Sequence, residues 1–294
     1  MTSTVPQTFA DEWAAWHRIR EQQLTHPHGF LAVTSLTWLG EHPVAAPGSP
    51  GRWWADSRGV VVELADGDEL VVEGTRVTGE HVVGELGLRE SRLLHDGDVA
   101  VEVAERGGRY VVRVRDPRSP LLAAHPGTPA FPADPRWSVP GRFVAFDAPR
   151  PTAVPGVLEG VEHVYDAPGT VEFTLDGTPY ALRAFPGHGD GAVMVLFSDA
   201  TSGDTTYPFR SLDLVPAADG SVQVDLNRAV NLPCAYTDLA TCPTPPAENR
   251  LPVAVEAGER TPTVRGAARP TDDGAELDRA ALVAPSQGPG SRAA

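Results

Sequence analysis

The sequence predicts a mainly β protein with an N-terminal helix, two β-rich lobes and a disordered C-terminal tail. Short apolar runs with a period of two recur along the chain, and turn signals such as Asp-Gly and Gly-Gly separate them. No long helical pattern lies between these runs, and the 29 glycines and 29 prolines indicate many turns. Antiparallel meanders, arranged as a sandwich or a barrel, are therefore the expected architecture of both lobes.

Residues 1–40 are expected to form one helix and a connecting segment. Thr8 has the residue type of a helix N-cap, and Asp11 follows in the first turn. The helix is expected to end before His26-Pro27, because the residue before a proline disfavours the helical conformation. Its apolar stripe is interpreted as core packing rather than a ligand site, and consists of Phe9, Trp13, Trp16 and Ile19.

Residues 41–125 are assigned to the first β lobe. The Pro/Gly-rich segment 43–59, which contains Trp53 and Trp54, is expected to be a long loop leading into the sheet. Strand-like runs follow at Val60–Leu64, Leu70–Val72, Val99–Val103 and Tyr110–Val114.

Residues 126–260 are assigned to the second β lobe, and the proline-rich connector Pro117–Pro140 joins it to the first lobe. The clearest hairpin spans residues 171–185 around the turn Asp176-Gly177. Ala192–Phe197 is apolar throughout and predicts a strand buried on both faces. Leu212–Val215 and Val222–Leu226 are expected to pair with each other. Residues 261–294 are rich in Ala, Pro, Gly and Ser and are expected to be mostly disordered.

The charge balance excludes two classes of partner. With 24 Lys and Arg against 39 Asp and Glu, the formal net charge is −15. So acidic a chain repels nucleic acid and anionic membranes, and neither is an expected partner.

The N-terminus lacks a signal-peptide pattern, and no apolar stretch approaches the roughly 18 residues of a membrane span. A cytoplasmic protein is therefore expected, with no oligomeric state predicted.

The absence of lysine from the sequence excludes several cofactor chemistries. No lysine Schiff base with pyridoxal phosphate can form, and no P-loop nucleotide site can be built. The glycine-rich run Gly187–Gly191 precedes a strand and not a helix, so it is no dinucleotide fingerprint. The nine histidines form no H-E-x-x-H pattern. The sequence therefore predicts no specific cofactor and no metal site.

Polar side chains concentrate in two segments, each directly after a predicted strand. The first is Asp199–Arg210, and the second is the proline-rich stretch Asn227–Val253. We call the two together the signature. If the strands between them form a meander, both segments lie at one end of the same sheet. Dense polar groups on a stiff backbone are typical of a preorganised binding site.

The signature carries motifs of a known family. It contains Asp199-Ala-Thr-Ser-Gly-Asp-Thr-Thr-Tyr207 and, after Asn227-Arg-Ala-Val-Asn-Leu-Pro-Cys-Ala-Tyr236, the run Cys242-Pro-Thr-Pro-Pro-Ala-Glu-Asn-Arg-Leu-Pro-Val253 with Ala257-Gly-Glu259 beyond. With Arg113-Val-Arg-Asp116 and Trp38-Leu39, these motifs resemble a bacterial family of unknown function, number 1684, from about residue 13 to residue 260. The resemblance implies no particular activity.

We expect a binding or catalytic site for a small polar molecule at the mouth of the second lobe. Glu248 is the candidate general base and Cys234 the candidate nucleophile. Arg210, Arg228 and Arg250 would hold an anionic group or stabilise negative charge. The other candidate ligand-binding residues are Tyr207, Asn227, Asn231, Tyr236 and Asn249.

Each candidate also has a structural interpretation. The arginines can clamp acidic residues in a rigid loop, and the asparagines can satisfy backbone groups of a segment that forms no ladder. The alternative function is therefore a non-catalytic binding or scaffold protein in which the signature is a structural plug.

Cys234 and Cys242 leave three interpretations open. They can be buried thiols that pack as small apolar groups, a disulfide, or a pair containing a nucleophile with a lowered pKa. The last two support a weaker alternative function, a thiol-redox role. The seven residues between the cysteines do not match the closely spaced ligand pairs of structural zinc sites.

Overall fold

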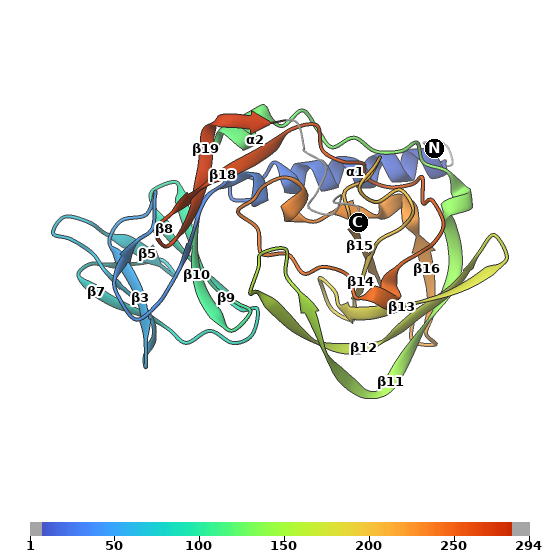
Figure 1. The fold of residues 1–294 in the computed structure, drawn as a ribbon, viewed down its shortest axis with the longest axis horizontal. Helices are drawn as coiled ribbons and strands as arrows, with labels where there is room; N and C mark the ends of the chain where they lie inside the picture. The colour runs from blue at the N-terminus through green and yellow to red at the C-terminus, as the bar shows by residue number, and fades with distance from the viewer. Residues whose placement is uncertain (1–7, 284–294) are drawn as a thin grey trace, which may run out of the picture.

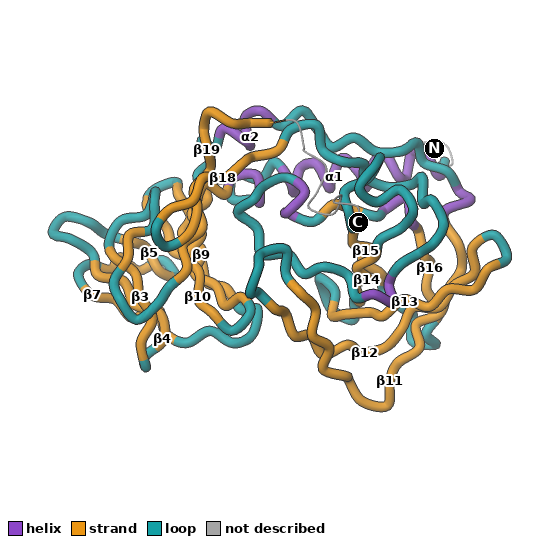
Figure 2. The backbone as a smooth tube through the Cα atoms, viewed as in Figure 1, coloured by secondary structure: helices purple, strands orange, loops and turns teal. Residues whose placement is uncertain are grey.

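The computed structural model describes residues 8–283 and is mainly β, as predicted. Figure 1 shows two lobes side by side, with helix α1 (Phe9–Leu24) lying along the second lobe and directed toward the first. Figure 2 shows strands and long loops through most of the rest of the chain. The remaining helical segments are short: α2 (Pro120–Ala124), η1 (Phe30–Ala32), η2 (Pro135–Trp137), η3 (Leu226–Arg228), η4 (Pro233–Ala235) and η5 (Ala247–Asn249).

Helix α1 begins with a capping box, which confirms the predicted N-cap. The backbone N–H of Asp11 donates to Thr8 Oγ1 over 3.2 Å, and the N–H of Thr8 donates to Asp11 Oδ2 over 3.1 Å. The helix ends at Leu24, before His26-Pro27. Trp13 and Trp16 are half-buried, but Ile19 is 55% exposed, so the buried stripe does not extend to it.

The first lobe combines two antiparallel sheets. A four-stranded sheet has the order β2-β3-β4-β7, and an eight-stranded sheet has the order β18-β19-β1-β10-β9-β8-β5-β6. The strands formed before the connector are β1 (Val33–Trp38), β2 (Val44–Ala45), β3 (Arg52–Asp56), β4 (Gly59–Glu63), β5 (Leu70–Val72), β6 (Thr75–Val77), β7 (Glu80–Gly84), β8 (Ser91–Asp96), β9 (Val99–Arg106) and β10 (Arg109–Arg115).

The core of the first lobe lies between these sheets. Trp53 and Val62 from the smaller sheet pack with Val101 and Val112 from the larger one. Trp53 has no exposed surface, because strand β3 turns it inward. The expectation of a loop over residues 43–59 was therefore wrong at β2 and β3, because burial of the whole Trp53 side chain outweighs the Pro/Gly-rich composition.

The second lobe is one seven-stranded antiparallel sheet of order β16-β11-β12-β13-β14-β15-β17. Strands β11 and β12 curve along the lower side of the lobe in Figure 1. The predicted hairpin is β12–β13, whose turn residues Asp176 and Gly177 have φ of 49° and 78°. The strands are β11 (Ser138–Pro155), β12 (Glu162–Leu175), β13 (Thr178–Pro186), β14 (Val193–Phe197), β15 (Arg210–Leu214), β16 (Ser221–Asp225) and β17 (Val230–Asn231).

One predicted strand pairing is wrong. β15 pairs with β14 and β17, whereas β16 pairs with β11 on the opposite edge of the sheet. There Val222 and Val224 are buried against the core of the lobe. Short-range turn signals mark where a chain reverses, but burial of the alternate valines decides which edge the strand joins.

The chain after residue 260 adds a hairpin to the first lobe. β18 (Arg265–Thr271) pairs with β19 (Gly274–Val283), and β19 pairs with the edge of β1. Disorder was expected over residues 261–294, but the hairpin shows that residues 265–271 and 274–283 form strands. Residues 284–294 lie outside the described residues. An unpaired strand edge offers free N–H and C=O groups, and β19 satisfies those of β1.

A third apolar cluster joins the lobes. Leu24 at the end of α1 and Leu121 in α2 pack with Ala235 and Tyr236 of the signature and with Leu277 of β19. The signature therefore lies at the junction of the lobes as well as at the end of the second sheet. Among residues 8–283, no helix is long and apolar enough to cross a membrane.

Candidate functional site

The Arg210 side chain is built into the protein interior. It has no exposed surface, and its Nη2 donates to Asp199 Oδ2 over 2.8 Å and to the carbonyl oxygen of Val255 over 3.1 Å. Its Nη1 donates to the carbonyl oxygens of Ala257 and Glu259. Arg210 therefore clamps the chain that follows the signature onto the start of β15.

Asn249 and Asn227 play a similar part. Asn249, which is fully buried, accepts from the backbone N–H of Arg183 and donates to the carbonyl oxygens of Arg183 and Leu196, over 2.7–2.8 Å. Asn227 accepts from the N–H of Asp134 over 2.9 Å and donates to its carbonyl oxygen over 3.0 Å. Both amides stand in for the missing backbone ladder of irregular segments.

Three of the predicted site residues are exposed. Arg228 pairs with Asp225 over 3.2 Å, and Glu248 pairs with Arg183 over 2.7 Å. Arg250 is also exposed. None of these three side chains lines either of the two pockets described below. The predicted candidates are thus divided between the interior and the surface and do not gather around one hollow.

Cys234 and Cys242 are free, buried thiols. The backbone N–H of Cys234 donates to Cys242 Sγ over 3.3 Å, so the sulfur atom is already a hydrogen-bond acceptor. Burial raises the pKa of Cys234 well above its ordinary value, which opposes the thiolate form that a nucleophile needs. Tyr207 lies beside this pair, and burial raises the pKa of its hydroxyl.

A pocket of about 380 Å³ lies between α1, residues 126–129 and Thr263. His17 and Glu21 of α1 form one wall, one turn apart on the same helix face. Residues 126–129 and Thr263 complete the lining. The pocket therefore draws on three segments that are far apart in the sequence.

A charged network stands behind this wall. Glu259, which is 1% exposed, accepts from Arg20 Nε over 3.0 Å, from the N–H of Asn231 over 2.6 Å and from the hydroxyl of Tyr236 over 3.2 Å. The Tyr236 hydroxyl also lies 3.0 Å from Thr128 Oγ1, in the pocket lining. Asn231 and Tyr236, both predicted ligand-binding residues, are therefore connected to the pocket through Glu259 and Thr128.

Glu21 is held as a carboxylate. His125 Nε2 lies 3.1 Å from Glu21 Oε2, and the backbone N–H of Thr128 donates to Glu21 Oε1 over 3.1 Å. Burial raises the pKa of Glu21, but the hydrogen bonds from His125 and Thr128 outweigh burial and lower it to about 2. A negative charge therefore faces the pocket at neutral pH.

Two polar atoms of this region lack partners. Within the described residues, His17 Nε2 and Asn231 Oδ1 are both buried and have no hydrogen-bond partner. Buried polar atoms without a partner are rare, because each costs about 1–3 kcal/mol. Trp13 stacks on the His17 ring with centroids 4.8 Å apart and a 10° angle between the planes, which fixes the orientation of the imidazole.

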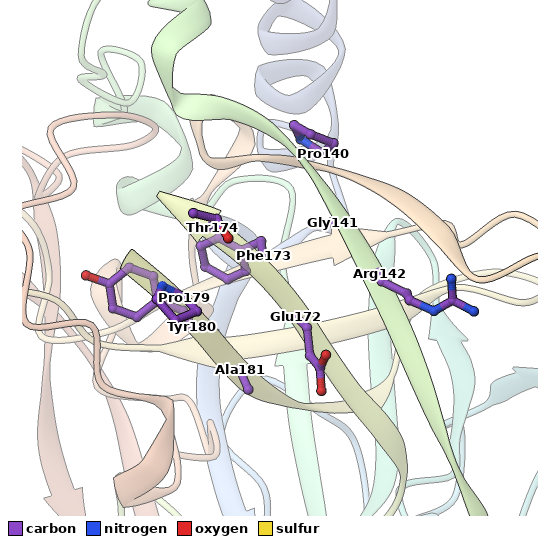
Figure 3. A pocket seen from close by; sticks show the side chains of 9 residues that line it. All are labelled: Pro140, Gly141, Arg142, Glu172, Phe173, Thr174, Pro179, Tyr180 and Ala181. Atoms are coloured by element: carbon purple, nitrogen blue, oxygen red, sulfur yellow. The ribbon is translucent and has the colours of Figure 1, made fainter. Parts of the chain in front are cut away.

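A second, larger hollow of about 600 Å³ lies on the outer face of β11, β12 and β13. Figure 3 shows the Arg142 guanidinium and the Tyr180 hydroxyl pointing away from each other, and the Glu172 carboxylate pointing in a third direction. Its polar groups do not converge on one point, so the hollow offers a ligand little orientation.

The residues around the smaller pocket were not among the predicted candidates, apart from Asn231 and Tyr236. One signal was available: His17 and Glu21 are four residues apart on a predicted helix, so they share a face. Glu259 closes the Ala-Gly-Glu motif of the family pattern. No local pattern links it to α1, because 238 positions separate it from Glu21 and only the fold brings them together.

Comparison with known proteins identifies the family. Residues 123–260, which include most of the connector, the seven strands of the second lobe and the signature, match the family described as "Protein of unknown function (DUF1684)". A search of curated proteins finds no match. Among solved structures, the solution NMR structure of an uncharacterized protein of Haloarcula marismortui is 32% identical, over 46% of this chain and 76% of that one, with a TM-score of 0.39. The chain belongs to the DUF1684 family, whose function is unknown.

Proposed function

We propose that this protein binds a small polar molecule in the pocket between α1 and residues 126–129. The observation that supports the proposal is the pair of partnerless buried atoms, His17 Nε2 and Asn231 Oδ1, around a network that reaches the pocket wall. A ligand with polar atoms would complete the hydrogen bond of His17 Nε2, which belongs to a residue of the pocket lining. A pocket volume of about 380 Å³ lies within the range of small-molecule sites.

The signature then has a supporting role. Arg210, Asn227 and Asn249 hold irregular backbone in place. Asn231 and Tyr236 fix the Glu259 carboxylate, which lies beside the side chains of α1. Ligand-contacting groups held by hydrogen-bonded neighbours need little reorganisation on binding. This proposal combines the predicted polar-molecule site with the plug interpretation, because the buried half of the signature acts as the frame of the site.

A panel of small amines, carboxylic acids and polyols, screened by saturation-transfer NMR, tests the proposal. At least one compound class should bind the wild-type protein, and T263W should abolish the signal because the indole fills the mouth of the pocket. T178W places the same side chain on an exposed threonine of β13 that lines neither pocket, and it should leave binding unchanged.

Two outcomes would contradict the proposal. Either no compound binds, or a compound binds T263W as well as it binds the wild-type protein. In the second case E248A and R250A, on the exposed side of the signature, show whether the ligand uses that surface instead.

A further inference from the structure

The three groups that meet at the back of this pocket have the composition of a transition-metal site. His17 Nε2 and one oxygen from each of the Glu21 and Glu259 carboxylates lie within 4.8 Å of one another. His17 Nε2 and Glu21 Oε1 are 3.9 Å apart. Ligand atoms that share a metal at bonds of about 2.1 Å stand at such separations after small side-chain movements.

We propose that His17, Glu21 and Glu259 bind one divalent transition-metal ion, with Zn²⁺ as the representative ion. The inference rests on the proposed function in that the ion would lie in the same pocket as the small polar molecule. It adds a metal ion that would bind the small molecule, at a site that no single sequence motif contains.

The first support is the state of the imidazole. Among the described residues, His17 Nε2 is buried without a hydrogen-bond partner, although it faces two carboxylates. A metal ion would satisfy this nitrogen directly, and the small polar molecule would then bind to the ion rather than to the imidazole. The stack on Trp13 holds the ring, which reduces the side-chain entropy lost when the ion binds.

The second support is the outer layer of hydrogen bonds. Glu21 is held by His125 and by the N–H of Thr128, and Glu259 is held by Arg20 and Tyr236. Carboxylate ligands of metals are usually oriented by such partners. Each Glu21 oxygen and Glu259 Oε1 takes part in one of these hydrogen bonds and keeps a lone pair for the ion, whereas Glu259 Oε2 accepts from both Asn231 and Tyr236. Both carboxylates are therefore pre-positioned and need only small side-chain movements to coordinate.

The third support is charge. Two carboxylates against the single guanidinium of Arg20 leave the cluster with an excess of negative charge. A divalent ion balances that excess, and it does so in a partly buried setting where Coulomb attraction is stronger than in water. The imidazole ligand favours zinc and similar metals over Mg²⁺ and Ca²⁺, which prefer oxygen ligands alone.

Three protein ligands leave a coordination position open toward the pocket. In zinc sites this arrangement accompanies binding of water or of a substrate oxygen, whereas structural sites are closed by four protein ligands. A polar molecule in the pocket would thus be held by the ion as well as by hydrogen bonds.

The test is Zn²⁺ titration of chelator-treated, full-length protein by isothermal calorimetry. The wild-type protein should bind one ion per chain, and an excess of Mg²⁺ should not compete. H17A and E21Q should weaken binding by more than the roughly 10–100-fold that loss of an outer partner costs. H42A and E41Q alter an adjacent exposed His–Glu pair outside the cluster and should bind as the wild type does.

Two measurements on the wild-type protein do not depend on whether the variants fold. Co²⁺ loaded in place of Zn²⁺ should give visible absorption bands of a low-coordinate nitrogen- and oxygen-ligated ion, and X-ray anomalous scattering should place the metal between His17 and Glu21. Failure of wild-type binding, metal found elsewhere, or zinc affinity unchanged by H17A overturns the assignment.

Metal binding and polar-molecule binding can fail separately. If zinc-free protein binds a panel compound and T263W abolishes that binding, the proposed function stands even when no metal is bound. If zinc binds in a His17-dependent way and no compound binds, the metal site stands and the proposed function fails.

Discussion

Arg210 donates from Nη2 to Asp199 Oδ2 over 2.8 Å, and both side chains are completely shielded from solvent. The pair connects the start of β15 to the first signature segment, while Nη1 of the same guanidinium binds the carbonyl oxygens of Ala257 and Glu259. One arginine thus fixes two pieces of irregular chain, the turn at Asp199 and the segment 255–259 that carries the Glu259 carboxylate.

Replacing Arg210 by methionine should destabilise the protein by about 3–5 kcal/mol, because it leaves the Asp199 carboxylate buried and unpaired. R228M is the matched control: Arg228 pairs with Asp225 at the surface, and its loss should cost no more than about 1 kcal/mol. Urea unfolding of both variants measures the difference. Equal unfolding midpoints for the two would show that the buried pair contributes no more than an exposed one.

The Glu102 carboxylate should make stability depend on acid. Burial raises the pKa of Glu102, but the charges of Arg113 and Arg115 outweigh it and lower the pKa to about 2, from 4.5. Because the folded-state pKa is the lower one, the stabilisation is complete above the unfolded-state pKa and disappears as pH falls through the folded-state value. E102Q should therefore cost about 3 kcal/mol at neutral pH, and the cost should shrink between about pH 4.5 and pH 2.

Chemical unfolding of the wild type and E102Q across this pH range tests the dependence. E69Q removes a carboxylate from an exposed pair with Arg76, and its effect should stay within about 1 kcal/mol. A cost of E102Q that does not change with pH would show that the carboxylate is not held by the arginines.

Both cysteines should resist alkylation in the folded protein. They are buried free thiols, and burial raises the pKa of Cys234. Iodoacetamide should modify neither under native conditions and both in urea, as intact-mass measurement would show. Rapid labelling of Cys234 under native conditions would instead support the thiol-redox alternative. So would an intact mass that reaches the value for two free thiols only after reductant is added.

The strand pairing between β19 and β1 should be sensitive to a single methyl group. A Cβ added at Gly274 would lie 2.0 Å from the carbonyl oxygen of Leu36, so G274A forces the strands apart. We expect a loss of about 1–3 kcal/mol and faster hydrogen exchange at residues 33–38. Gly40 has no atom within 4 Å of such a Cβ, and G40A should leave exchange unaffected. Unchanged protection in G274A would contradict the pairing.

The sequence by itself determined the local elements of this protein. The Thr8–Asp11 capping box, the Asp176-Gly177 turn and the apolar run at β14 each depend on residues close together in the chain. Propensity, turn geometry and hydrophobic period act over a few residues, so these features can be read without the rest of the fold. The long signature motif was equally visible, and it identified the family.

Only the tertiary structure decided how these elements meet. It placed β16 beside β11, added β19 to β1, and turned Arg210 and Asn249 inward. It also brought His17 and Glu21 of α1 to Glu259 near the end of the family match. Such contacts arise from burying apolar faces and from satisfying buried polar groups, and both depend on the whole packed chain rather than on neighbouring residues.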